Sequence, residues 1–400
     1  MTFEERLVSG APQEIYALPG SLFEFHERVM NAGRAAPAGI HHLFELYGAA
    51  YYRHTPNVDM IIDPDGLGAE RLLEHYYSER HCPAAASVVL RIDDAVIDNS
   101  VICCGPGAAA PILYETFRLP DRHDIVRVPG SPDDLPVAGF QHNDCSYLYL
   151  GSLGSSNYGH WLVDDLPRAK AWLDLRRRFG IECIVVMPTY GGRIDEIRLQ
   201  SLRQLIHPRI EVQFIAPDRP CRLRNLYYAT PVSFHPRIKS PGALDFVRTR
   251  VEACLPMLES EPSARLFVAR RPPNSRTIVN FDKLWQYLAG LGFEMVEPET
   301  FDFIGQVTLF RNARIVVGQM GAGMTNSLFC RPATNLTYLA PIGWTEPFYL
   351  DLAALGGQQY NILTGPPLDN GMPHLSSFTV PLMLLHHRLA HIGVTGPPAA

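Results

Sequence analysis

Hydrophobic and polar residues follow two different periods along this chain. Near the N-terminus, apolar residues three and four positions apart in residues 21–30 and 69–80 predict amphipathic helices. We therefore expect residues 1–80 to form a helical N-terminal extension. From residue 87 the pattern changes to short β-branched runs separated by turns. Strands are predicted at residues 87–98, 112–120 and 146–152.

Beyond residue 157, predicted helices and strands alternate. Helices are predicted at residues 158–178, 193–205, 281–292, 304–313 and 381–393. Strands are predicted at residues 182–188, 211–217, 265–270, 293–298, 314–318 and 335–341. This alternation is typical of parallel βαβ units, which bind their ligands at the carboxyl ends of the strands.

Two segments interrupt the alternation, a Pro-rich one at residues 231–241 and a polar one at residues 259–263. We place a domain boundary near residue 240, since 400 residues exceed what one hydrophobic core usually supports. The predicted fold is α/β, with two Rossmann-like domains facing a cleft. The expected parts are a helical N-terminal extension at 1–80, Rossmann-like domains at 81–240 and 241–375, and a C-terminal helix and tail at 376–400.

Composition and charge narrow the classes of function. With 46% hydrophobic and 19% charged residues, the chain is typical of a globular protein. Its formal net charge is -6 and its Lys and Arg residues form no long run, so nucleic acid is not an expected partner. The one basic cluster, Arg176 to Arg178, is interpreted as the end of a helix, where cations complement the helix dipole.

The cysteines and the N-terminus bear on the compartment. None of the eight cysteines has metal-ligand spacing, so reduced thiols are expected. The first ten residues include acidic side chains where a signal peptide carries positive charge, and no apolar run approaches the roughly 18 residues of a membrane span. We expect a cytoplasmic protein without a membrane span.

The first block with candidate chemistry is residues 156–175. On a regular helix, His160, Asp164 and Arg168 share one face, opposite an apolar stripe. Asp164 could hold the His160 ring in one tautomer and raise its basicity, as a general base requires. Asn157 is the expected N-cap. The alternative is a solvated polar face on which Asp164 and Arg168 form an ordinary ion pair.

The second block is residues 314–341, in which a buried strand runs into a glycine-rich turn and a predicted helix. The glycines are Gly318, Gly321 and Gly323. Glycines let the backbone approach a ligand, and a helix N-terminus presents N–H groups to a diphosphate. Thr325 and Asn326 could add side-chain hydrogen bonds. A tight strand-to-helix turn without a ligand is the alternative.

A third block, residues 265–276, carries arginines after a predicted strand. Arg270, Arg271 and Arg276 occupy the exit of this strand. Arginines there suit a bidentate grip on phosphate, and we favour Arg270 and Arg276 for that role.

Together the three blocks resemble glycosyltransferase family 61, from about residue 87 to residue 365. The family motif N-Y-x-H-W, followed by an acidic residue and P-R, is matched by Asn157, Tyr158, His160, Trp161, Asp165, Pro167 and Arg168. A strand ending in R-R with a further Arg is matched by Arg270, Arg271 and Arg276. The motif V-G-x-H-G-A-G-L-T-N is matched by residues 317–326, with Met320 in the place of the histidine.

The resemblance implies a GT-B fold, with the acceptor on the N-terminal domain and the donor on the C-terminal one. It also implies an inverting glycosyltransferase that uses a nucleotide sugar, most often a UDP-sugar. The acceptor would be a hydroxyl of a glycan, protein or small molecule, and polysaccharide biosynthesis is an expected setting. The residues expected to bind the nucleotide sugar are Asn157, Arg168, Arg270, Arg276, Gly318, Gly321, Ala322, Gly323, Thr325 and Asn326.

The expected mechanism is a direct displacement in which a base deprotonates the acceptor hydroxyl. His160 is the first choice for the base, with Asp164 or Asp165 as orienting group or substitute. Arg270, Arg276 and the amides of residues 321–323 would stabilise the leaving diphosphate in place of a metal. Because Asp302 has no second carboxylate beside it, no metal ligands and no cofactor are expected.

Two other functions remain open at this point. Met320 cannot donate a hydrogen bond or act as a base, which motivates a catalytically silent protein of the same fold that binds a sugar or nucleotide. A less favoured reading is an NAD(P)-dependent oxidoreductase, because residues 316–324 resemble a dinucleotide-binding turn. Their spacing is G-x-x-G-x-G, however, and the next strand ends without an acidic residue.

Overall fold

The computed structural model divides the chain into two compact units. Unit 1 comprises Met1–Ala50, Pro83–Phe234 and Lys239–Cys254, and unit 2 comprises Tyr51–Cys82, His235–Ile238 and Leu255–Ala400. The residues that the structure describes are 15–16, 39–53, 57–62, 70, 74, 81–84, 86–98, 100–104, 112–113, 145–217, 219–236, 238–257, 261–270, 276–344, 346–369 and 372–396.

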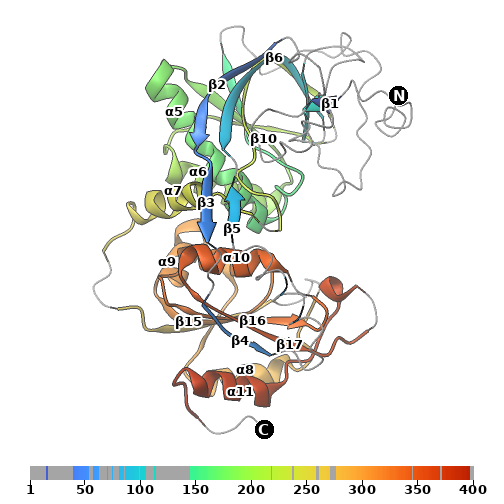
Figure 1. The fold of residues 1–400 in the computed structure, drawn as a ribbon, viewed down its shortest axis with the longest axis vertical. Helices are drawn as coiled ribbons and strands as arrows, with labels where there is room; N and C mark the ends of the chain where they lie inside the picture. Colours follow the sequence, from blue (N-terminus) through green and yellow to red (C-terminus); the bar gives the residue numbers. More distant parts are fainter. Residues whose placement is uncertain are drawn as a thin grey trace. The chain divides into compact units, whose positions relative to one another are not determined.

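Unit 1 is built on a nine-stranded mixed sheet (Figure 1). Its strands are β1 (Ile15–Tyr16), β2 (Ile40–Tyr47), β6 (Ser87–Asp98), β7 (Val101–Cys103), β8 (Ile112–Leu113), β9 (Ser146–Tyr149), β10 (Cys183–Pro188), β11 (Val212–Ile215) and β12 (Cys221–Ala229). The order is β1-β8-β7-β6-β12-β9-β10-β11, with β2 also on β6. Neighbours from β12 to β11 are parallel, whereas β6 is antiparallel to β12 and β2. Only this parallel part is Rossmann-like.

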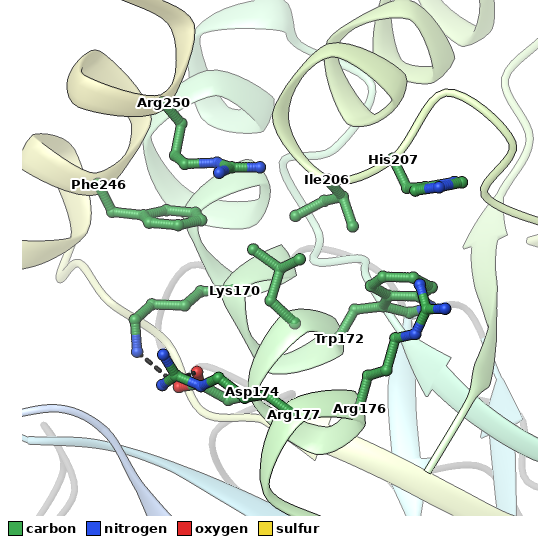
Figure 2. Close-up of a pocket in the computed structure, with 10 residues that line it drawn as sticks. Lys170, Trp172, Asp174, Arg176, Arg177, Ile206, His207, Phe246 and Arg250 are labelled. Atoms are coloured by element: carbon green, nitrogen blue, oxygen red, sulfur yellow. Dashed lines mark hydrogen bonds and ion pairs between the residues drawn. The ribbon is translucent and has the colours of Figure 1, made fainter. Parts of the chain in front are cut away.

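The helices of unit 1 follow β9, β10 and β12. They are α4 (Tyr158–His160), a π-helix (Trp161–Asp165), a 3-10 helix (Leu166–Ala169), α5 (Lys170–Phe179), α6 (Gly192–Leu205) and α7 (Pro241–Glu252). Residues from α5 and α7, together with two that follow α6, line a cavity of about 640 Å³ (Figure 2).

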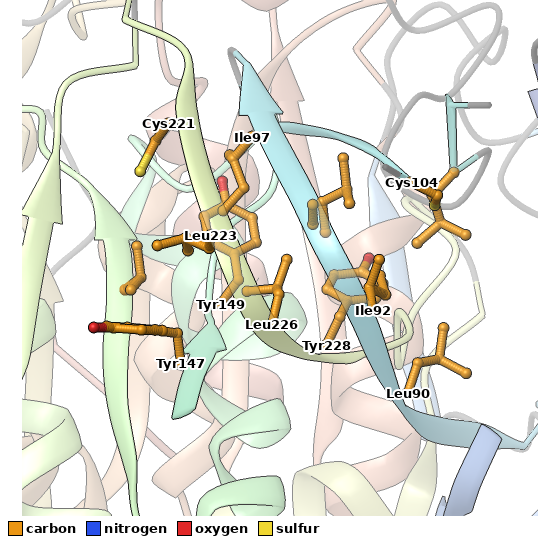
Figure 3. Close-up of a cluster of buried hydrophobic side chains, with 14 of the residues drawn as sticks. Leu90, Ile92, Ile97, Cys104, Tyr147, Tyr149, Cys221, Leu223, Leu226 and Tyr228 are labelled. Atoms are coloured by element: carbon orange, nitrogen blue, oxygen red, sulfur yellow. The ribbon is translucent and has the colours of Figure 1, made fainter. Parts of the chain in front are cut away.

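Apolar side chains of β6, β9 and β12 form the core of unit 1 (Figure 3). Ile92 and Leu226, which are paired in register, and Tyr147 and Tyr149 are almost fully buried. The β-branched and aromatic residues that predicted these strands therefore pack against each other, as such side chains do on a pleated surface.

Unit 2 is built on a fully parallel six-stranded sheet of order β14-β13-β15-β16-β17-β4. Its strands are β4 (Asn57–Ile62), β13 (Ala264–Val268), β14 (Glu294–Val296), β15 (Ala313–Gln319), β16 (Asn335–Pro341) and β17 (Gln359–Gly365). Its helices are α8 (Phe281–Gly290), α9 (Phe303–Arg311), α10 (Pro347–Gly356) and α11 (Leu382–His391), with 3-10 helices at Pro298–Thr300, Ala322–Phe329 and Pro373–Leu375.

Helices α8 and α11 lie on one face of this sheet and α9 and α10 on the other (Figure 1). Leu284 and Leu288 of α8 and Leu385 and Leu389 of α11 pack with buried residues of β13, β15, β16 and β17. Such a three-layer arrangement is the one expected for a parallel sheet, because both of its faces must be covered.

Two expected boundaries differ from the structure. The described part of residues 1–80 includes strands β1, β2 and β4, so a purely helical extension is wrong for that part. β4 completes the sheet of unit 2, where Asn57 pairs with Gln359. The predicted helix at 21–30 and most of that at 69–80 lie outside the described residues. The boundary near residue 240 also moves, because α7 belongs to unit 1 and the division falls after Cys254.

The remaining differences concern short elements. Strands β12, β17 and helix α10 were not predicted, and α11 contributes to the core of unit 2 instead of forming a separate tail. Strand β3 (Ala50–Arg53) pairs with β5 (His81–Ala84) in a small separate sheet.

No helix within the described ranges has the length and apolar character needed to cross a membrane. The cysteines whose side chains are described form no disulfide.

Candidate functional site

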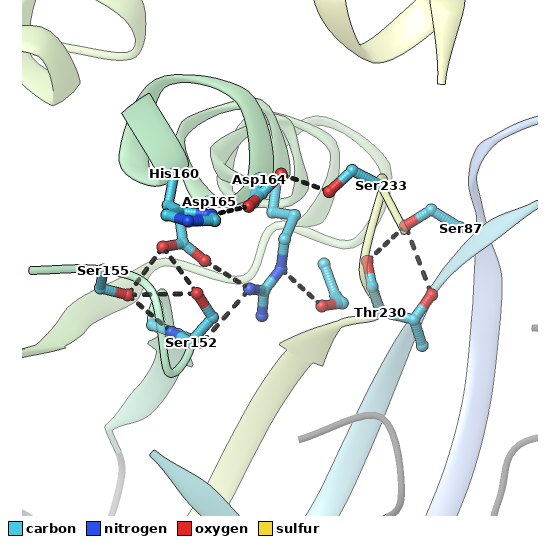
Figure 4. Close-up of polar contacts among 11 residues, drawn as sticks. Ser87, Ser152, Ser155, His160, Asp164, Asp165, Thr230 and Ser233 are labelled. Atoms are coloured by element: carbon cyan, nitrogen blue, oxygen red, sulfur yellow. Dashed lines mark hydrogen bonds and ion pairs between the residues drawn. The ribbon is translucent and has the colours of Figure 1, made fainter. Parts of the chain in front are cut away.

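Polar side chains of unit 1 gather where β9 and β12 end (Figure 4). β9 is followed by the π-helix segment and β10, which lies on one side of β9, whereas β12 lies on its other side. The chain therefore reverses its direction across the sheet between β9 and β12, and parallel sheets bind ligands at such a point.

The Arg168 side chain connects the ends of these two strands. Its side chain is 2% exposed, and its guanidinium donates to the carbonyl of Gly151 after β9 at 3.3 Å and to that of Ala229 in β12 at 2.8 Å. It also pairs with Asp165 at 3.0 Å and lies 4.8 Å from the ring centre of Tyr228. These contacts give Arg168 a structural role, in place of the expected contact with a nucleotide sugar.

Asp165 is fully buried and held by hydroxyl groups. Ser155 donates to its Oδ2 at 2.7 Å and Ser152 at 3.1 Å, while Arg168 pairs with Oδ1. Burial raises the pKa of the Asp165 carboxyl, and the nearby Arg168 and Ser155 oppose this effect. Because its side chain is 0% exposed, Asp165 cannot receive a proton directly from an acceptor hydroxyl.

His160 and Asp164 form the most base-like pair of this network. Nδ1 of His160 lies 2.7 Å from Oδ2 of Asp164, and the side chains are 26% and 8% exposed. Ser233 donates to the other oxygen of Asp164. A Cβ atom on Gly154 would lie 2.7 Å from Cγ of His160, so the ring occupies the space above this glycine.

The π-helix changes one part of the regular-helix prediction, the partner of Arg168. One wider turn at Trp161–Asp165 changes the angular positions of the residues after it. Asp164 contacts His160 as the i,i+4 spacing predicted, whereas Arg168 pairs with Asp165 and not with Asp164, so the three side chains do not share one face. Asn157 is the N-cap as predicted, since its side chain accepts from the Gly159 N–H at 2.8 Å.

The second group of candidate residues lies at the carboxyl ends of β13 and β15 in unit 2. β13 lies between β14 and β15, so the chain again reverses direction across the sheet at this point. Arg270 follows β13, and Gly321 follows β15. A Cβ on Gly321 would lie 2.8 Å from Nη1 of Arg270 and 3.8 Å from Nη2 of Arg276. The two arginines thus converge on one glycine.

Arg276 is held in an unusual conformation. Its φ of 64° lies in the left-handed region, its Nη1 donates to the Met320 carbonyl at 3.3 Å, and its guanidinium lies 4.3 Å from the ring centre of Trp344. Burial and the positive charge of Arg270 lower the pKa of Arg276 to about 10, and burial also lowers the pKa of Arg270. Two partly buried like charges in this position favour an anion beside them.

Other residues of the glycine-rich motif have packing roles. A Cβ on Gly318 would lie 2.4 Å from the Met324 sulfur, so this glycine serves close packing. Asn326 is buried and donates to Gln306 at 2.8 Å and to the Gly323 carbonyl at 3.2 Å. Met320 and Thr325 are also fully buried.

The remaining expected residues divide between exposed and capping positions. Ala322 and Gly323 are partly exposed at the start of the 3-10 helix. Asp302 caps α9, accepting from the Gly305 N–H at 2.7 Å. Arg271 lies outside the described residues.

Sequence reasoning missed several side chains of these two groups. Ser152, Ser155 and Ser233 carried no motif, although a serine-rich stretch directly after a strand is a weak signal for polar contacts at the strand end. Gly154 and Trp344 were also missed. Their roles are contacts with the His160 ring and the Arg276 guanidinium, which no local pattern shows.

No curated protein matches the chain. A solved structure, a bacterial iron-containing dodecameric glycosyltransferase TibC from enterotoxigenic E. coli H10407, is 13% identical with a TM-score of 0.26, over 58% of this chain and 64% of that one. This chain therefore spans less than two thirds of that protein.

A second structure is the dodecameric iron-containing heptosyltransferase TibC in complex with ADP-D-beta-D-heptose. It is 12% identical with a TM-score of 0.27, over 72% of this chain and 81% of that one. Both proteins are described as iron-containing, which contradicts the expectation that no metal is required. That expectation was based on a missing carboxylate pair, which does not test other kinds of metal site, and it is corrected here.

A family model provides the firmest match. Residues 158–337 match Glycosyltransferase 61. The match includes the His160 and Asp164 segment of unit 1 and the Arg270, Arg276 and Gly321 positions of unit 2. This match, over less than half of the chain, confirms the resemblance drawn from the three motifs.

Proposed function

We propose that this protein is an inverting glycosyltransferase that transfers a sugar from a nucleotide sugar to an acceptor hydroxyl. The observation that carries the proposal is the convergence of Arg270 and Arg276 on Gly321, at the carboxyl ends of β13 and β15. Two guanidinium groups beside a glycine backbone suit the diphosphate of a donor, because Arg binds phosphate oxygens bidentately and glycine admits them closely.

Unit 2 is thus the proposed donor unit, and three features support this role. Trp344 holds the Arg276 guanidinium by cation–π contact, so little side-chain freedom is lost on binding. The first N–H groups of the 3-10 helix at Ala322–Phe329 lie directly after Gly321 and have no partners within the helix. A bound diphosphate would also relieve the repulsion between Arg270 and Arg276.

Unit 1 is the proposed acceptor unit, with His160 as the general base. When Asp164 accepts a hydrogen bond from Nδ1–H, the neutral ring carries its basic lone pair on Nε2, the atom proposed to take the proton of the acceptor hydroxyl. The hydroxyl oxygen then attacks the anomeric carbon, the bond from that carbon to the phosphate oxygen breaks, and the nucleoside diphosphate leaves with the electron pair. Attack from the side opposite the leaving group inverts the anomeric configuration.

The finer parts of the proposal rest on the family resemblance. They are a GT-B arrangement of the two units, a UDP-sugar as donor, a glycan, protein or small-molecule acceptor, and a cytoplasmic setting in polysaccharide biosynthesis. The geometry of Arg270 and Arg276 is equally suited to any nucleoside diphosphate, because it addresses the phosphates and not the base.

Calorimetric titration with UDP, ADP, GDP, CMP and dTDP tests the donor site. Each titration is run with and without added divalent metal, on the wild type, Arg270→Ala and Arg265→Ala. Arg265 lies in β13, the strand that precedes Arg270, but donates to the Leu291 carbonyl at 2.6 Å, so it serves as a matched control. We expect one nucleotide to bind the wild type and Arg265→Ala, and to bind Arg270→Ala at least about tenfold more weakly.

Turnover is then measured as release of the nucleoside diphosphate from the matching sugar donors over a panel of hydroxyl acceptors. Saturable binding with release that depends on acceptor supports the transferase. Binding without hydrolysis or transfer would favour the catalytically silent alternative that Met320 motivates. Binding that is equal in wild type and Arg270→Ala would overturn the donor site.

A further inference from the structure

The cavity in unit 1 is lined mainly by positive charges, whereas the chain as a whole has a negative net charge. Its described lining includes four cationic side chains, Lys170, Arg176, Arg177 and Arg250, and one carboxylate, Asp174. The whole chain carries a formal net charge of -6. A concave surface with one sign of charge concentrates ions of the opposite sign.

Asp174 cannot neutralise the cations around it. This buried carboxylate accepts from Lys170 at 2.6 Å and from Arg177 at 3.0 Å, and Arg178 lies 3.7 Å away. Arg176 pairs outside this group, with Glu182 at 3.2 Å. The cluster that the sequence presented as an ordinary helix end is therefore a local excess of positive charge.

Arg250 enters the cavity from a different helix, α7, as Figure 2 shows. It donates through Nε and Nη2 to the Leu205 carbonyl, at 3.0 and 2.9 Å. A carbonyl carries no net charge, and no carboxylate of the described residues forms an ion pair with Arg250. Both bonds fix the guanidinium toward the end of α6, so its position is set before any ligand arrives.

The rest of the lining is apolar or aromatic. Trp172 stacks on His207 with 6.3 Å between ring centres and 28° between ring planes, and Phe246, Leu173 and Ile206 complete the wall. Nδ1 of His207 accepts from the Arg209 N–H at 3.1 Å, which places the ring proton of the neutral imidazole on Nε2 as a donor. The cavity thus combines flat rings with cations.

We propose that this cavity binds a small anionic molecule, one phosphate or carboxylate carried on a flat apolar body. The volume of about 640 Å³ lies within the range of small-molecule sites. Arg250 and the α5 cations hold the anion, and Trp172, His207 and Phe246 pack against the body. The site lies wholly within unit 1 and does not depend on the proposed donor site in unit 2.

Calorimetry on the full chain at low ionic strength tests this site with three probes. 1-Naphthyl phosphate has both the anion and the flat body, 1-naphthol lacks the anion, and inorganic phosphate lacks the body. We expect saturable one-to-one binding of 1-naphthyl phosphate, and binding of the other two at least about tenfold weaker, since each lacks one half of the recognition.

Variants separate this cavity from other anion sites. Arg250→Gln and Arg177→Gln are each expected to weaken 1-naphthyl phosphate binding by about tenfold, which is the scale of one charge-assisted hydrogen bond. Arg177 is 73% exposed, so its replacement leaves folding intact even if Arg250→Gln does not. Arg248→Gln is the matched control, because Arg248 lies on the same helix outside the cavity lining and pairs with Asp245.

The expected result for Arg248→Gln and for Arg270→Ala is binding equal to the wild type. Binding that survives both Arg177→Gln and Arg250→Gln, or that disappears in Arg270→Ala, would overturn the proposal, as would equal binding of 1-naphthol. Loss of 1-naphthyl phosphate binding in Arg250→Gln, with nucleotide binding retained in the same variant, would separate this site from the proposed donor site.

Discussion

Asp165 and Arg168 form a buried ion pair with 3.0 Å between Oδ1 and Nη1, at the point where two parallel strands end. The side chains are 0% and 2% exposed, and the Arg168 guanidinium also bonds to backbone carbonyls on both strands. The arrangement resembles a catalytic acid–base pair in sequence but serves to position the segment that carries His160 and Asp164.

Removing the cation should therefore reduce stability more than it affects any ligand contact. We expect Arg168→Met to lower the free energy of unfolding by about 3 kcal/mol at neutral pH, because it leaves a buried carboxylate without its partner. The exposed pair of Arg193 and Glu196 is the control, and Glu196→Gln should change stability by less than about 0.5 kcal/mol. Urea unfolding of both variants measures the difference.

The cost of Arg168→Met should depend on pH. Burial raises the pKa of Asp165, so the unfolded chain releases this proton at lower pH than the folded protein does. The protonated Asp165 carboxyl contributes fully to the free energy of unfolding below the pKa that it has in the unfolded chain. This contribution is lost as pH rises through the pKa that it has in the folded protein. Removing Arg168 raises that pKa further, so the deficit of Arg168→Met should shrink as pH falls toward about 4, near the usual Asp value. A deficit independent of pH would contradict this assignment.

Loss of the His160 imidazole should affect chemistry more than donor binding. We expect His160→Gln to lower kcat by at least about 100-fold, the usual scale for a general base, with nucleotide affinity unchanged. Asp164→Asn should also lower kcat, since Asp164 orients the ring through its contact with Nδ1. The exposed His374 provides the control, and His374→Gln should behave as the wild type. Wild-type kcat in His160→Gln would remove His160 as the base.

A methyl group at Gly154 should act through His160. A Cβ there would lie 2.7 Å from Cγ of the imidazole, so the ring must move away from its contact with Asp164. We expect Gly154→Ala to lower kcat by about tenfold or more, as misplacement of a catalytic group does, with KM for the donor little changed. Gly290→Ala is the control, because nothing lies within 4 Å of a Cβ at that position. Steady-state kinetics of both variants gives the comparison.

Two arginines of unit 2, the proposed donor unit, should respond in opposite ways to replacement by glycine. Arg276 has a φ of 64° and lies beside Arg270, so Arg276→Gly relieves backbone strain and charge repulsion while it loses the contact with Trp344. We expect stability within about 1 kcal/mol of the wild type and nucleotide binding at least about tenfold weaker.

Arg265→Gly should show the reverse. Arg265 lies in strand β13 and bonds to the Leu291 carbonyl, so the variant should lose about 1 to 2 kcal/mol of stability and keep nucleotide affinity. Thermal unfolding and calorimetry on the two variants measure both quantities. Equal loss of nucleotide affinity in the two variants would argue against a specific anion site at Arg276.

The local pattern of the sequence determined many of the strands and helices. Residues 87–98 and 335–341 read as strands and have those bounds in the structure, because β-branched and apolar runs specify strands within a few residues. The same local pattern identified Asn157 as a cap, and the motifs indicated a resemblance over about residues 87–365, within which residues 158–337 match the family model.

Only the tertiary structure decided how those elements and side chains combine. The i,i+4 spacing indicated the contact between His160 and Asp164, but the pairing of Arg168 with Asp165 and not with Asp164 was visible only in the structure, which has a π turn at Trp161–Asp165. Strand β4 joined the sheet of unit 2, nearly 300 residues from its partner β17 along the chain. The cations of α5 line a cavity together with Arg250 of α7, which the fold brings close to them. Local propensity acts within a few residues. Strand pairing and the burial of charged side chains depend instead on contacts between segments that are distant along the chain, and the local sequence pattern does not show those contacts.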